Sequence, residues 1–483
     1  MIDAGLLDPL AQGGRALELT GDAAFLVAML DAELALARSL VDTGLSPHWM
    51  AEVCDGLAAP DLAAIDLVAI AAESRAGGNP VIPLVRHLSA AAEELRAGAS
   101  DHLHVGATSQ DILDTAAMIV ARAVCGEALA QLRRLGEGLA ALADRHRATP
   151  MVGRTLGQHA APTSLGLVAA AWLDGVTSAI ATLAAVRAEL PLQYGGAVGT
   201  GEALAAAVSA RGGGGGAEPA GAVPAGAEPA GAGPGAVLAA AVLERLGDRL
   251  GLRVPALSWH SNRATVLGLA SALAQSVAAA GVIALDVAML ARTEVGELSE
   301  GGAPGSGGSS AMPHKRNPVT AVLVVATARR TPQLLASLYG SALSEDQRPS
   351  GAWHAEWLPL RDLERAAVAA TTAAVDLVRG LEVHAHRMTA NLDLTAGLVS
   401  SERVSTALAA VIGKRAAFDL VERASVESVR DGRTLQAALD GLLAEQPDAV
   451  RAAAREAFRP AGMDTTAIDR VIAAFTALLP EKS

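Results

Sequence analysis

The sequence predicts an all-α protein built from long helices. Hydrophobic residues make up 51% of the chain, but most are Ala, Leu and Val, with only four Phe and two Tyr. Apolar residues recur three and four positions apart over several long stretches, which is typical of helices that bury one face. A chain of 483 residues is too long for one compact core, so we expect either about three helical domains or one elongated architecture with shared helices.

Helical spacing of apolar residues predicts three helices near the start of the chain, at residues 23–40, 61–72 and 83–97. These helices would form a small N-terminal helical domain over residues 1–107. The only cysteines, Cys54 and Cys125, lie in apolar stretches and are expected to be buried free thiols. The first residues lack a basic region followed by an apolar block, so no export signal is predicted and a cytoplasmic location is expected.

A central long-helix bundle is predicted over residues 108–380. Thr108 to Asp111 form a candidate helix cap before an apolar stretch at residues 112–147. Three further long stretches follow, at residues 162–190, 263–296 and 317–343. Long Ala-rich helices favour a bundle that assembles with copies of itself. Residues 264–285 could just span a bilayer, but they are rich in Ala and lack aromatic anchors, so we predict a buried core helix and no membrane partner.

Two segments depart from the long-helix pattern. Residues 212–235 are almost entirely Gly, Ala, Pro and Glu, a composition that predicts a disordered surface insert which tolerates shortening. Residues 381–483 break into shorter apolar-periodic stretches separated by Gly, Asp and Pro. They are predicted to form a C-terminal helical domain.

Charge and histidine spacing exclude several classes of function. The net charge of -13 provides no basic field for nucleic acid, so an anionic substrate would require a local cationic pocket. The eleven His residues show no spacing typical of metal ligands. No metal, no cofactor and no nucleic-acid partner are therefore predicted.

A glycine-rich segment at residues 301–318 is the strongest candidate for a catalytic loop. Glycines alone would indicate a linker. Here they lead into Ser309, Ser310 and the sequence MPHKRNP at residues 312–318, which combines a cation pair, an amide and two prolines. Such a loop can close over an anionic substrate and stabilise developing negative charge.

This loop resembles the signature of the fumarase/aspartase superfamily, and two other segments match its conserved regions: HVGATSQD at residues 104–111 and GRTLGQHA at residues 153–160. The resemblance implies that Ser309 is the catalytic base, with Ser310 the weaker candidate. It also implies that Lys315 and Asn317 bind the carboxylate on which a second negative charge develops, and that Thr108 and Ser109 bind a carboxylate.

The resemblance defines a complete candidate site. The catalytic residues would be Ser309 and His159. The substrate-binding residues would be Thr108, Ser109, Arg154, Thr155, His260, Arg263, Met312, Lys315, Arg316 and Asn317. Simpler roles remain open for several of these residues: Thr108 and Ser109 can act only as a helix cap, and a lone histidine such as His159 or His260 is often structural.

Leu156 distinguishes between branches of the superfamily. The adenylosuccinate lyase and fumarase branches have a histidine at this position, which serves as an acid or activates water, whereas leucine can do neither. Leucine is similar to what 3-carboxy-cis,cis-muconate cycloisomerases show, and so are GNPVIPL, WHSNR and GAWHAEW at residues 78–84, 259–263 and 351–357. The two tryptophans of the last segment, Trp353 and Trp357, would also fit a simple packing pair on a helix.

Three functions follow from this resemblance. The first is a cycloisomerase that interconverts 3-carboxy-cis,cis-muconate and carboxymuconolactone in aromatic catabolism. The second is a lyase that eliminates nitrogen from a substituted succinate and releases fumarate, of the nitrosuccinate or adenylosuccinate type; Tyr194, Pro349 and Ser350 depart from the cycloisomerase pattern and leave it open. The third is an inactive helical structural protein, against which the intact Ser309 and Lys315 argue. The resemblance further implies a homotetramer with sites shared between subunits and a small polycarboxylate substrate.

Overall fold

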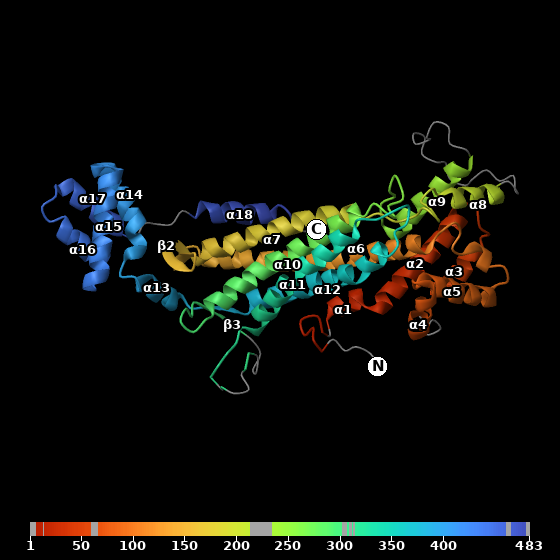
Figure 1. Cartoon of the computed structure of the whole chain (residues 1–483), viewed down its shortest axis with the longest axis horizontal. Helices are drawn as coiled ribbons and strands as arrows, with labels where there is room; N and C mark the ends of the chain where they lie inside the picture. The colour runs from red at the N-terminus through yellow and green to blue at the C-terminus, as the bar shows by residue number, and fades with distance from the viewer. Residues whose placement is uncertain are drawn as a thin grey trace. The chain divides into compact units, whose positions relative to one another are not determined.

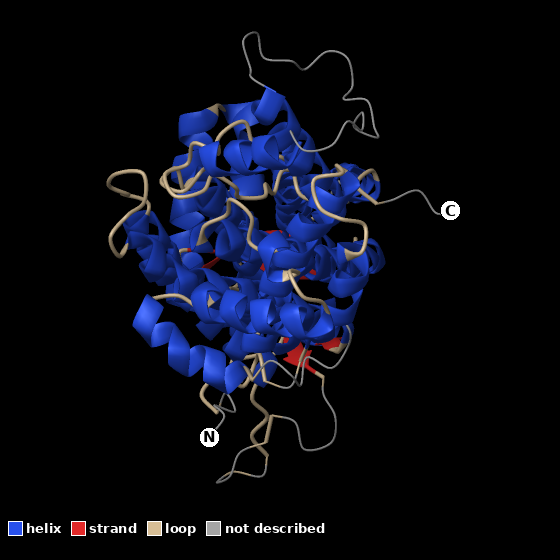
Figure 2. Ribbon diagram, turned by 90° about the vertical axis from the view of Figure 1, so that its right-hand side faces the viewer, coloured by secondary structure: helices blue, strands red, loops and turns tan. Residues whose placement is uncertain are grey.

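The computed structural model describes residues 6–12, 14–58, 66–212, 234–301, 307–308, 312, 314–459 and 465–479. Helices make up nearly all of the regular structure (Figure 2), and the described strands form only two two-stranded sheets. The predicted all-α class is therefore confirmed. Contacts divide the chain into two compact units. Unit 1 comprises Met1–Ala130, Ala181–Val277 and Thr327–Ala370, and unit 2 comprises Gln131–Ile180, Ala278–Ala326 and Thr371–Ser483. The division into three domains remains a prediction.

The first helices of unit 1 include three that pack around a small apolar core. The first helices are α1 (Arg15–Thr20), α2 (Asp22–Asp42), α3 (Met50–Ala58), α4 (Leu67–Gly77), α5 (Val81–Leu95) and the 3-10 helix η2 (Ser100–His102). Leu34, Met50 and Leu88 bring α2, α3 and α5 together in this core, and Cys54 is buried with them as a free thiol. The helix predicted from residue 61 is described only from α4 onward, where the Asp66 carboxylate accepts hydrogen bonds from the first-turn amides of Val68 and Ala69.

Five long helices contribute residues to both units. They are α6 (Ser109–Arg145), α7 (Leu165–Ala188), α10 (Ala264–Leu290), α11 (Val319–Ser341) and α12 (Ala352–Arg379). Four of them correspond to predicted stretches. The sequence did not predict α12 at this length. Pro359 lies inside this helix, although proline usually interrupts a helix. Its buried apolar face, which includes Leu363 and Ala367, shows that packing outweighs the proline.

Two of these helices, α7 and α10, are long and apolar enough to cross a membrane by length and composition alone. Core helices of soluble proteins pass the same test. The most apolar window of α10 is 61% buried inside the chain, against 44% for α7. The burial of α10 favours the predicted core helix. Within unit 2, the two helices are joined by a hydrogen bond of 2.7 Å from Trp172 Nε1 to Asp286 Oδ2.

An antiparallel hairpin precedes α7 and was not predicted. Its strands are β1 (Pro150–Thr155) and β2 (Gln158–Ser164). The sequence predicted a helix from residue 162, and this is wrong, because Pro162 lies on β2 opposite Val152 and α7 starts only at Leu165. Ser164 Oγ accepts a hydrogen bond of 3.1 Å from the Leu167 amide and so caps the first turn of α7.

Two helices that were not predicted flank the glycine-rich insert. They are α8 (Glu202–Gly212) and α9 (Pro234–Leu250), and they contact each other in unit 1. The prediction of a loop over residues 212–235 therefore needs correction at both ends; residues 213–233 lie outside the described residues. A Cβ atom at Gly235 would lie only 2.6 Å from the Ala205 carbonyl oxygen, so this glycine allows α8 and α9 to approach closely.

Shorter elements of unit 2 follow α12, as the sequence predicted from residue 381. They are β4 (Leu381–Val383), which pairs with β3 (Leu298–Glu300), then α13 (Ala385–Asp393), the 3-10 helix η3 (Leu398–Ser400), α14 (Ser401–Ile412), α15 (Lys414–Asp431), α16 (Leu435–Leu442), α17 (Asp448–Phe458) and α18 (Thr466–Thr476). Helices α14 to α17, blue in Figure 1, enclose an apolar core of their own that includes Leu408, Ala424 and Leu439.

Candidate active site

Thr108 and Ser109 lie at the start of α6, where the backbone leaves a turn at Gly106 with a φ of 70°. The Asp111 carboxylate accepts a hydrogen bond of 2.9 Å from the Thr108 amide, which satisfies one backbone donor at the end of the helix. Both side chains are half-buried. The helix-cap alternative and the site alternative are therefore compatible, because Asp111 forms the cap bond and the Thr108 hydroxyl is directed elsewhere.

Arg348 is the partner of the Thr108 hydroxyl, and sequence reasoning missed it. Its Nη1 atom donates to Thr108 Oγ1 at 2.9 Å, and its Nε atom donates to Gln110 Oε1 at 3.4 Å. Arg348 lies in the loop between α11 and α12, far from Thr108 in sequence, and it is half-buried. The pairing places a cation beside the Thr108–Ser109 segment, as an anionic substrate requires. Arg348 directly precedes Pro349 and Ser350, which depart from the cycloisomerase pattern, and this position was the one sign in the sequence that the segment could belong to the site.

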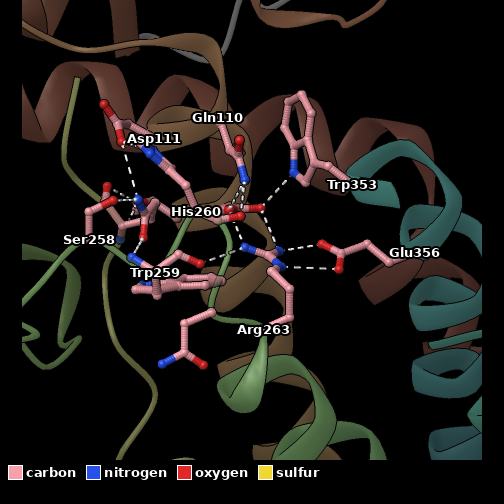
Figure 3. Close-up of polar contacts among 12 residues, drawn as sticks. Gln110, Asp111, Ser258, Trp259, His260, Arg263, Trp353 and Glu356 are labelled. Atoms are coloured by element: carbon pink, nitrogen blue, oxygen red, sulfur yellow. Dashed lines mark hydrogen bonds and ion pairs between the residues drawn. The ribbon is translucent and has the colours of Figure 1, made fainter. Parts of the chain in front are cut away.

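Behind Thr108, a buried network joins α6 to the segment before α10 (Figure 3). His260 Nε2 lies 2.7 Å from Asp111 Oδ1, and both side chains are buried. The other Asp111 oxygen accepts from the Gly196 amide at 2.9 Å. Gln110 Nε2 donates to the His260 carbonyl at 3.0 Å. This arrangement fixes Asp111 and His260 against each other, so in unit 1 His260 is placed to orient the Thr108 segment from behind.

Arg263 is buried between two carboxylates. It donates from Nη1 and Nη2 to the Asp114 oxygens at 2.7 and 3.1 Å, and from Nε to Glu356 Oε2 at 3.1 Å, with a further contact from Nη2 to Glu356 Oε1. Trp353 Nε1 also donates to Asp114, at 2.9 Å. Burial raises the pKa of Glu356 to about 7, against the lowering effect of Arg263. One guanidinium thus serves two buried carboxylates, and only 2% of the Arg263 side chain is exposed.

The same region of unit 1 holds two further polar contacts from the first conserved segment. Tyr194 donates its hydroxyl to the Val105 carbonyl at 2.6 Å, and burial raises its pKa well above the usual value. His104 Nδ1 lies 2.6 Å from Oε1 of the buried Glu33. Burial lowers the pKa of His104, but the hydrogen bond and the charge of Glu33 outweigh it, and the net pKa is raised. The segment before α6 is therefore held rigidly from both sides.

In unit 2, the β1–β2 hairpin carries the whole second conserved segment, residues 153–160. Arg154 is the register partner of His159, and Thr155 is the partner of Gln158. Leu156 lies at the tip with a φ of 51° and is fully exposed, at 102%. A left-handed backbone is unusual for leucine. Arg154 forms a two-pronged ion pair with Glu297. The residue predicted to bind a substrate carboxylate therefore binds a carboxylate of its own chain.

The described part of the candidate catalytic loop, residues 301–318, comprises Gly301, Gly307, Gly308, Met312 and residues 314–318, so Ser309 and Ser310 lie outside it. Lys315 and Arg316 are exposed, and Met312 is 45% exposed. Asn317 donates two hydrogen bonds to the Gly307 carbonyl, one of 2.8 Å from its backbone N–H and one of 3.3 Å from its side-chain Nδ2. A Cβ atom at Gly307 would lie 2.6 Å from the Asn317 oxygen. Glycine is therefore required where the backbone at residue 307 approaches the backbone of Asn317.

The predicted residues thus fall into separate groups within each unit. In unit 1, the start of α6 with Thr108 and Ser109 is connected to His260 through Asp111 and to Arg263 through Asp114, although these segments are far apart in sequence. Unit 2 brings together Arg154 and His159 on the hairpin, and separately Lys315 and Asn317 on the loop. In the part of the chain that the structure describes, no group of three or more His, Cys, Asp or Glu side chains has the geometry of a metal site.

Comparison with known proteins shows the family. A family model described as lyase matches residues 29–211 and 221–332. A nitrosuccinate lyase from Streptomyces davaonensis is 43% identical over 90% of this chain and 86% of its own length. A 3-carboxy-cis,cis-muconate cycloisomerase from Bradyrhizobium diazoefficiens is 38% identical over 90% of this chain and 89% of its own. The crystal structure of 3-carboxy-cis,cis-muconate lactonizing enzyme from Pseudomonas putida superposes with a TM-score of 0.82 at 32% identity, and covers 98% of this chain and 99% of that one.

The fold and these relatives define an enzyme with the lyase or isomerase chemistry of the fumarase/aspartase superfamily. Within it, the chain belongs to the lyase family that contains the 3-carboxy-cis,cis-muconate cycloisomerases. The predicted family is therefore confirmed, and an inactive structural protein is no longer needed as an explanation.

Proposed function

We propose that this enzyme eliminates nitrite from nitrosuccinate and releases fumarate. The observation that carries the proposal is the 43% identity with a nitrosuccinate lyase over 90% of the chain. Leu156 supports it, because a hairpin tip without an imidazole suits a leaving group that needs no proton. Nitrite is a weak base that stays ionised at neutral pH, so it can leave without protonation. The cycloisomerase, which the sequence motifs favour, becomes the second candidate.

The proposed reaction is a β-elimination. A base removes a proton from the CH2 carbon, which bears no nitro group. The electron pair moves into the carboxylate attached to this carbon. The resulting aci-carboxylate returns the pair to form the carbon–carbon double bond while the carbon–nitrogen bond breaks. Nitrite departs with the bonding electrons. The products are fumarate, nitrite and one proton, which the base later passes to water.

Ser309 is the proposed base, and Lys315 and Asn317 are proposed to hold the carboxylate that becomes doubly charged. A cation and an amide are suited to this role, because they strengthen their contacts as charge develops. Thr108 and Ser109 are proposed to bind the other carboxylate, with Arg348 as the adjacent cation. Thr155, His159, Met312 and Arg316 remain candidate substrate contacts. His260 and Arg263 are buried, which favours a role in orienting the Thr108 segment over direct contact with the substrate.

The second candidate is the interconversion of 3-carboxy-cis,cis-muconate and carboxymuconolactone. Relatives with this name at 34–38% identity favour it, as does the Trp353–Trp357 segment. In the cyclising direction, a substrate carboxylate oxygen would attack the alkene carbon, and Ser309 would deliver a proton to the carbanion. The same loop would stabilise the same type of intermediate.

Parallel assays distinguish the two candidates. The purified protein is incubated with nitrosuccinate, with 3-carboxy-cis,cis-muconate and with adenylosuccinate, while fumarate, nitrite and lactone are quantified. We expect equal amounts of fumarate and nitrite from nitrosuccinate, and no turnover of adenylosuccinate. Lactone formation with kcat/KM far above that for nitrosuccinate would establish the second candidate and overturn the first.

A further inference from the structure

Glu297 is a buried carboxylate placed directly before the strand that leads into the catalytic loop. Its side chain is 0% exposed, whereas that of Arg154 is 21% exposed. Arg154 Nη1 donates to Glu297 Oε2 at 2.9 Å, and Arg154 Nη2 donates to Oε1 at 2.6 Å. Two parallel charge-assisted bonds fix both the distance and the plane of the guanidinium. The pair therefore joins β1 to the segment before β3.

Helix α13 adds a third anchor to the same carboxylate. Asn391, which is buried, donates from Nδ2 to Glu297 Oε1 at 2.7 Å and to the Val295 carbonyl at 2.9 Å. Arg387 on the same helix donates to the Val295 and Glu294 carbonyls, both at 3.0 Å. Glu297 is thus held by donors from β1 and α13, as a buried carboxylate requires.

The carboxylate also decides how much positive charge Arg154 can offer to a substrate. A bidentate carboxylate at hydrogen-bond distance cancels most of the guanidinium field at any point beyond the pair. Withdrawal of Arg154 towards a substrate would leave Glu297 buried and unpaired, which is strongly unfavourable. Arg154 is therefore poorly suited to the substrate-binding role that the family resemblance implies.

The segment after Glu297 leads directly to the catalytic loop. Strand β3 pairs with β4, and its last residue, Glu300, accepts hydrogen bonds from the Thr320 and Ala321 amides at the start of α11, at 3.0 and 3.2 Å. The loop lies between these two anchored ends. On the other side of the Arg154–Glu297 pair, the hairpin carries Thr155, Leu156 and His159.

We propose that Arg154 is a positioning residue that locks the hairpin to the base of the catalytic loop through Glu297 and Asn391, and that it does not bind the substrate. The proposal rests on the proposed function for its kinetic test. It changes the assignment of one residue of the site and adds Glu297 and Asn391 to the residues on which turnover depends.

A double-mutant cycle tests the proposal. The variants are Arg154→Gln, Glu297→Gln and the double variant, with kcat and KM measured for each. For a positioning pair, Arg154→Gln should lower kcat by about 10²-fold with KM little changed, because small misplacements of site groups cost about that much. The double variant should recover at least tenfold of the lost kcat, because it removes the unpaired buried charge and leaves two amides that can bond each other.

A substrate-binding role for Arg154 predicts different kinetics. If Arg154 binds the substrate, Arg154→Gln should raise KM tenfold or more, and the additional Glu297→Gln change should bring no recovery; that result would overturn the proposal. Arg154→Lys gives a second variant in case Arg154→Gln does not fold. A positioning role predicts a kcat loss close to that of Gln, since one ammonium cannot bond both oxygens in the fork geometry. A near-native kcat in Arg154→Lys would contradict it.

An exposed two-pronged pair of the same unit provides the matched control. Arg430 donates to both oxygens of Asp431 at 2.6 and 2.9 Å, and Arg430→Gln should leave kcat and KM unchanged. Amide hydrogen exchange separates this proposal from the proposed function. Exchange should accelerate together over residues 150–164 and 295–301 in Arg154→Gln, and return towards the native rate in the double variant, whichever substrate is used. Unchanged exchange in both segments would contradict the lock even if the wild-type protein turns over neither substrate.

Discussion

Glu364 on α12 is fully buried, and among the described residues neither of its carboxylate oxygens has a hydrogen-bond partner. Burial raises its pKa to about 8, and the charge of Arg361 acts in the opposite direction. The ordinary pKa of a glutamate carboxyl group is 4.5. Since the folded protein binds the proton more tightly, the contribution of this group to stability is fully present below pH 4.5 and is lost as the pH rises to about 8.

This residue gives a prediction about pH and stability. Glu364→Gln removes the ionisation, so the variant should gain stability relative to wild type as the pH rises from 4.5 to 8, by up to about 4 kcal/mol. Urea unfolding across this pH range measures the difference. Glu422→Gln, at an exposed position, is the control and should show no such trend. A constant difference between wild type and Glu364→Gln at all pH values would contradict the prediction.

The catalytic loop gives a prediction at the same scale. Ser309→Ala removes the proposed base but keeps Lys315 and Asn317, so kcat should fall by about 10² to 10⁴-fold while KM changes little. Lys315→Ala should raise KM as well as lower kcat, because the cation contacts both the bound carboxylate and the doubly charged intermediate. Steady-state kinetics on the preferred substrate provide the measurement.

Ser310→Ala is the control for the adjacent hydroxyl. It should retain most of the turnover, since the resemblance assigns the base to Ser309. If Ser310→Ala is the more damaging change and Ser309→Ala remains near-native, the proton is carried by the other serine.

At the scale of elements, helical periodicity predicted most of the long helices, and its failures have local causes. The sequence predicted a helix from Pro162, but this residue lies on a strand of the hairpin that turns at Leu156. The strands of this hairpin show no alternation of apolar and polar residues that would have predicted them. Helix α12 contains Pro359, but α11, which was predicted at nearly its full length, contains Pro332, so an internal proline did not decide which helices were predicted. Helix α9 begins at Pro234, inside a low-complexity segment, because α8 offers it a surface that composition does not reveal.

The candidate site was predictable to a similar degree. Resemblance of short motifs made Thr108, Lys315 and Asn317 candidates, because a run of unusual residues within one segment is visible in a sequence. Partners across large sequence separations were not visible. Arg348 beside Thr108 and Glu297 beside Arg154 were found only from the fold, since an ordinary charged residue carries no local sign of which buried charge it pairs with.

The insert provides a prediction about elements. Deletion of residues 213–233 with a short Gly/Ser connection should leave activity and melting temperature nearly unchanged, because the segment lacks core-forming side chains. Deletion of residues 212–235 should lower the melting temperature, since it removes the start of α9, where Gly235 contacts α8. Thermal unfolding of the two variants side by side tests this. Equal melting temperatures would show that the first turn of α9 contributes nothing, and a large loss in the shorter deletion would show that the insert itself packs.

For the whole molecule, the main prediction concerns assembly. We expect a homotetramer in solution and no activity in the monomer, because superfamily sites combine segments from different subunits. Partial exposure of the apolar α7 and α10 windows is consistent with further helix packing. Light scattering combined with assays across a dilution series measures both properties. A fully active monomer at nanomolar concentration would contradict the shared site.

The exposed tip of the hairpin has a consequence for how this enzyme can diverge. Leu156 is fully exposed, and its backbone conformation is supported by the hairpin and by the adjacent Gly157 with a φ of 78°. A residue under no packing demand from its own chain can be exchanged in one mutational step without loss of foldability. Under the proposed function, in which position 156 lies near the leaving group, a substitution there could change which leaving group is accepted while the inherited core stays constant, so that new chemistry would need no compensating mutations.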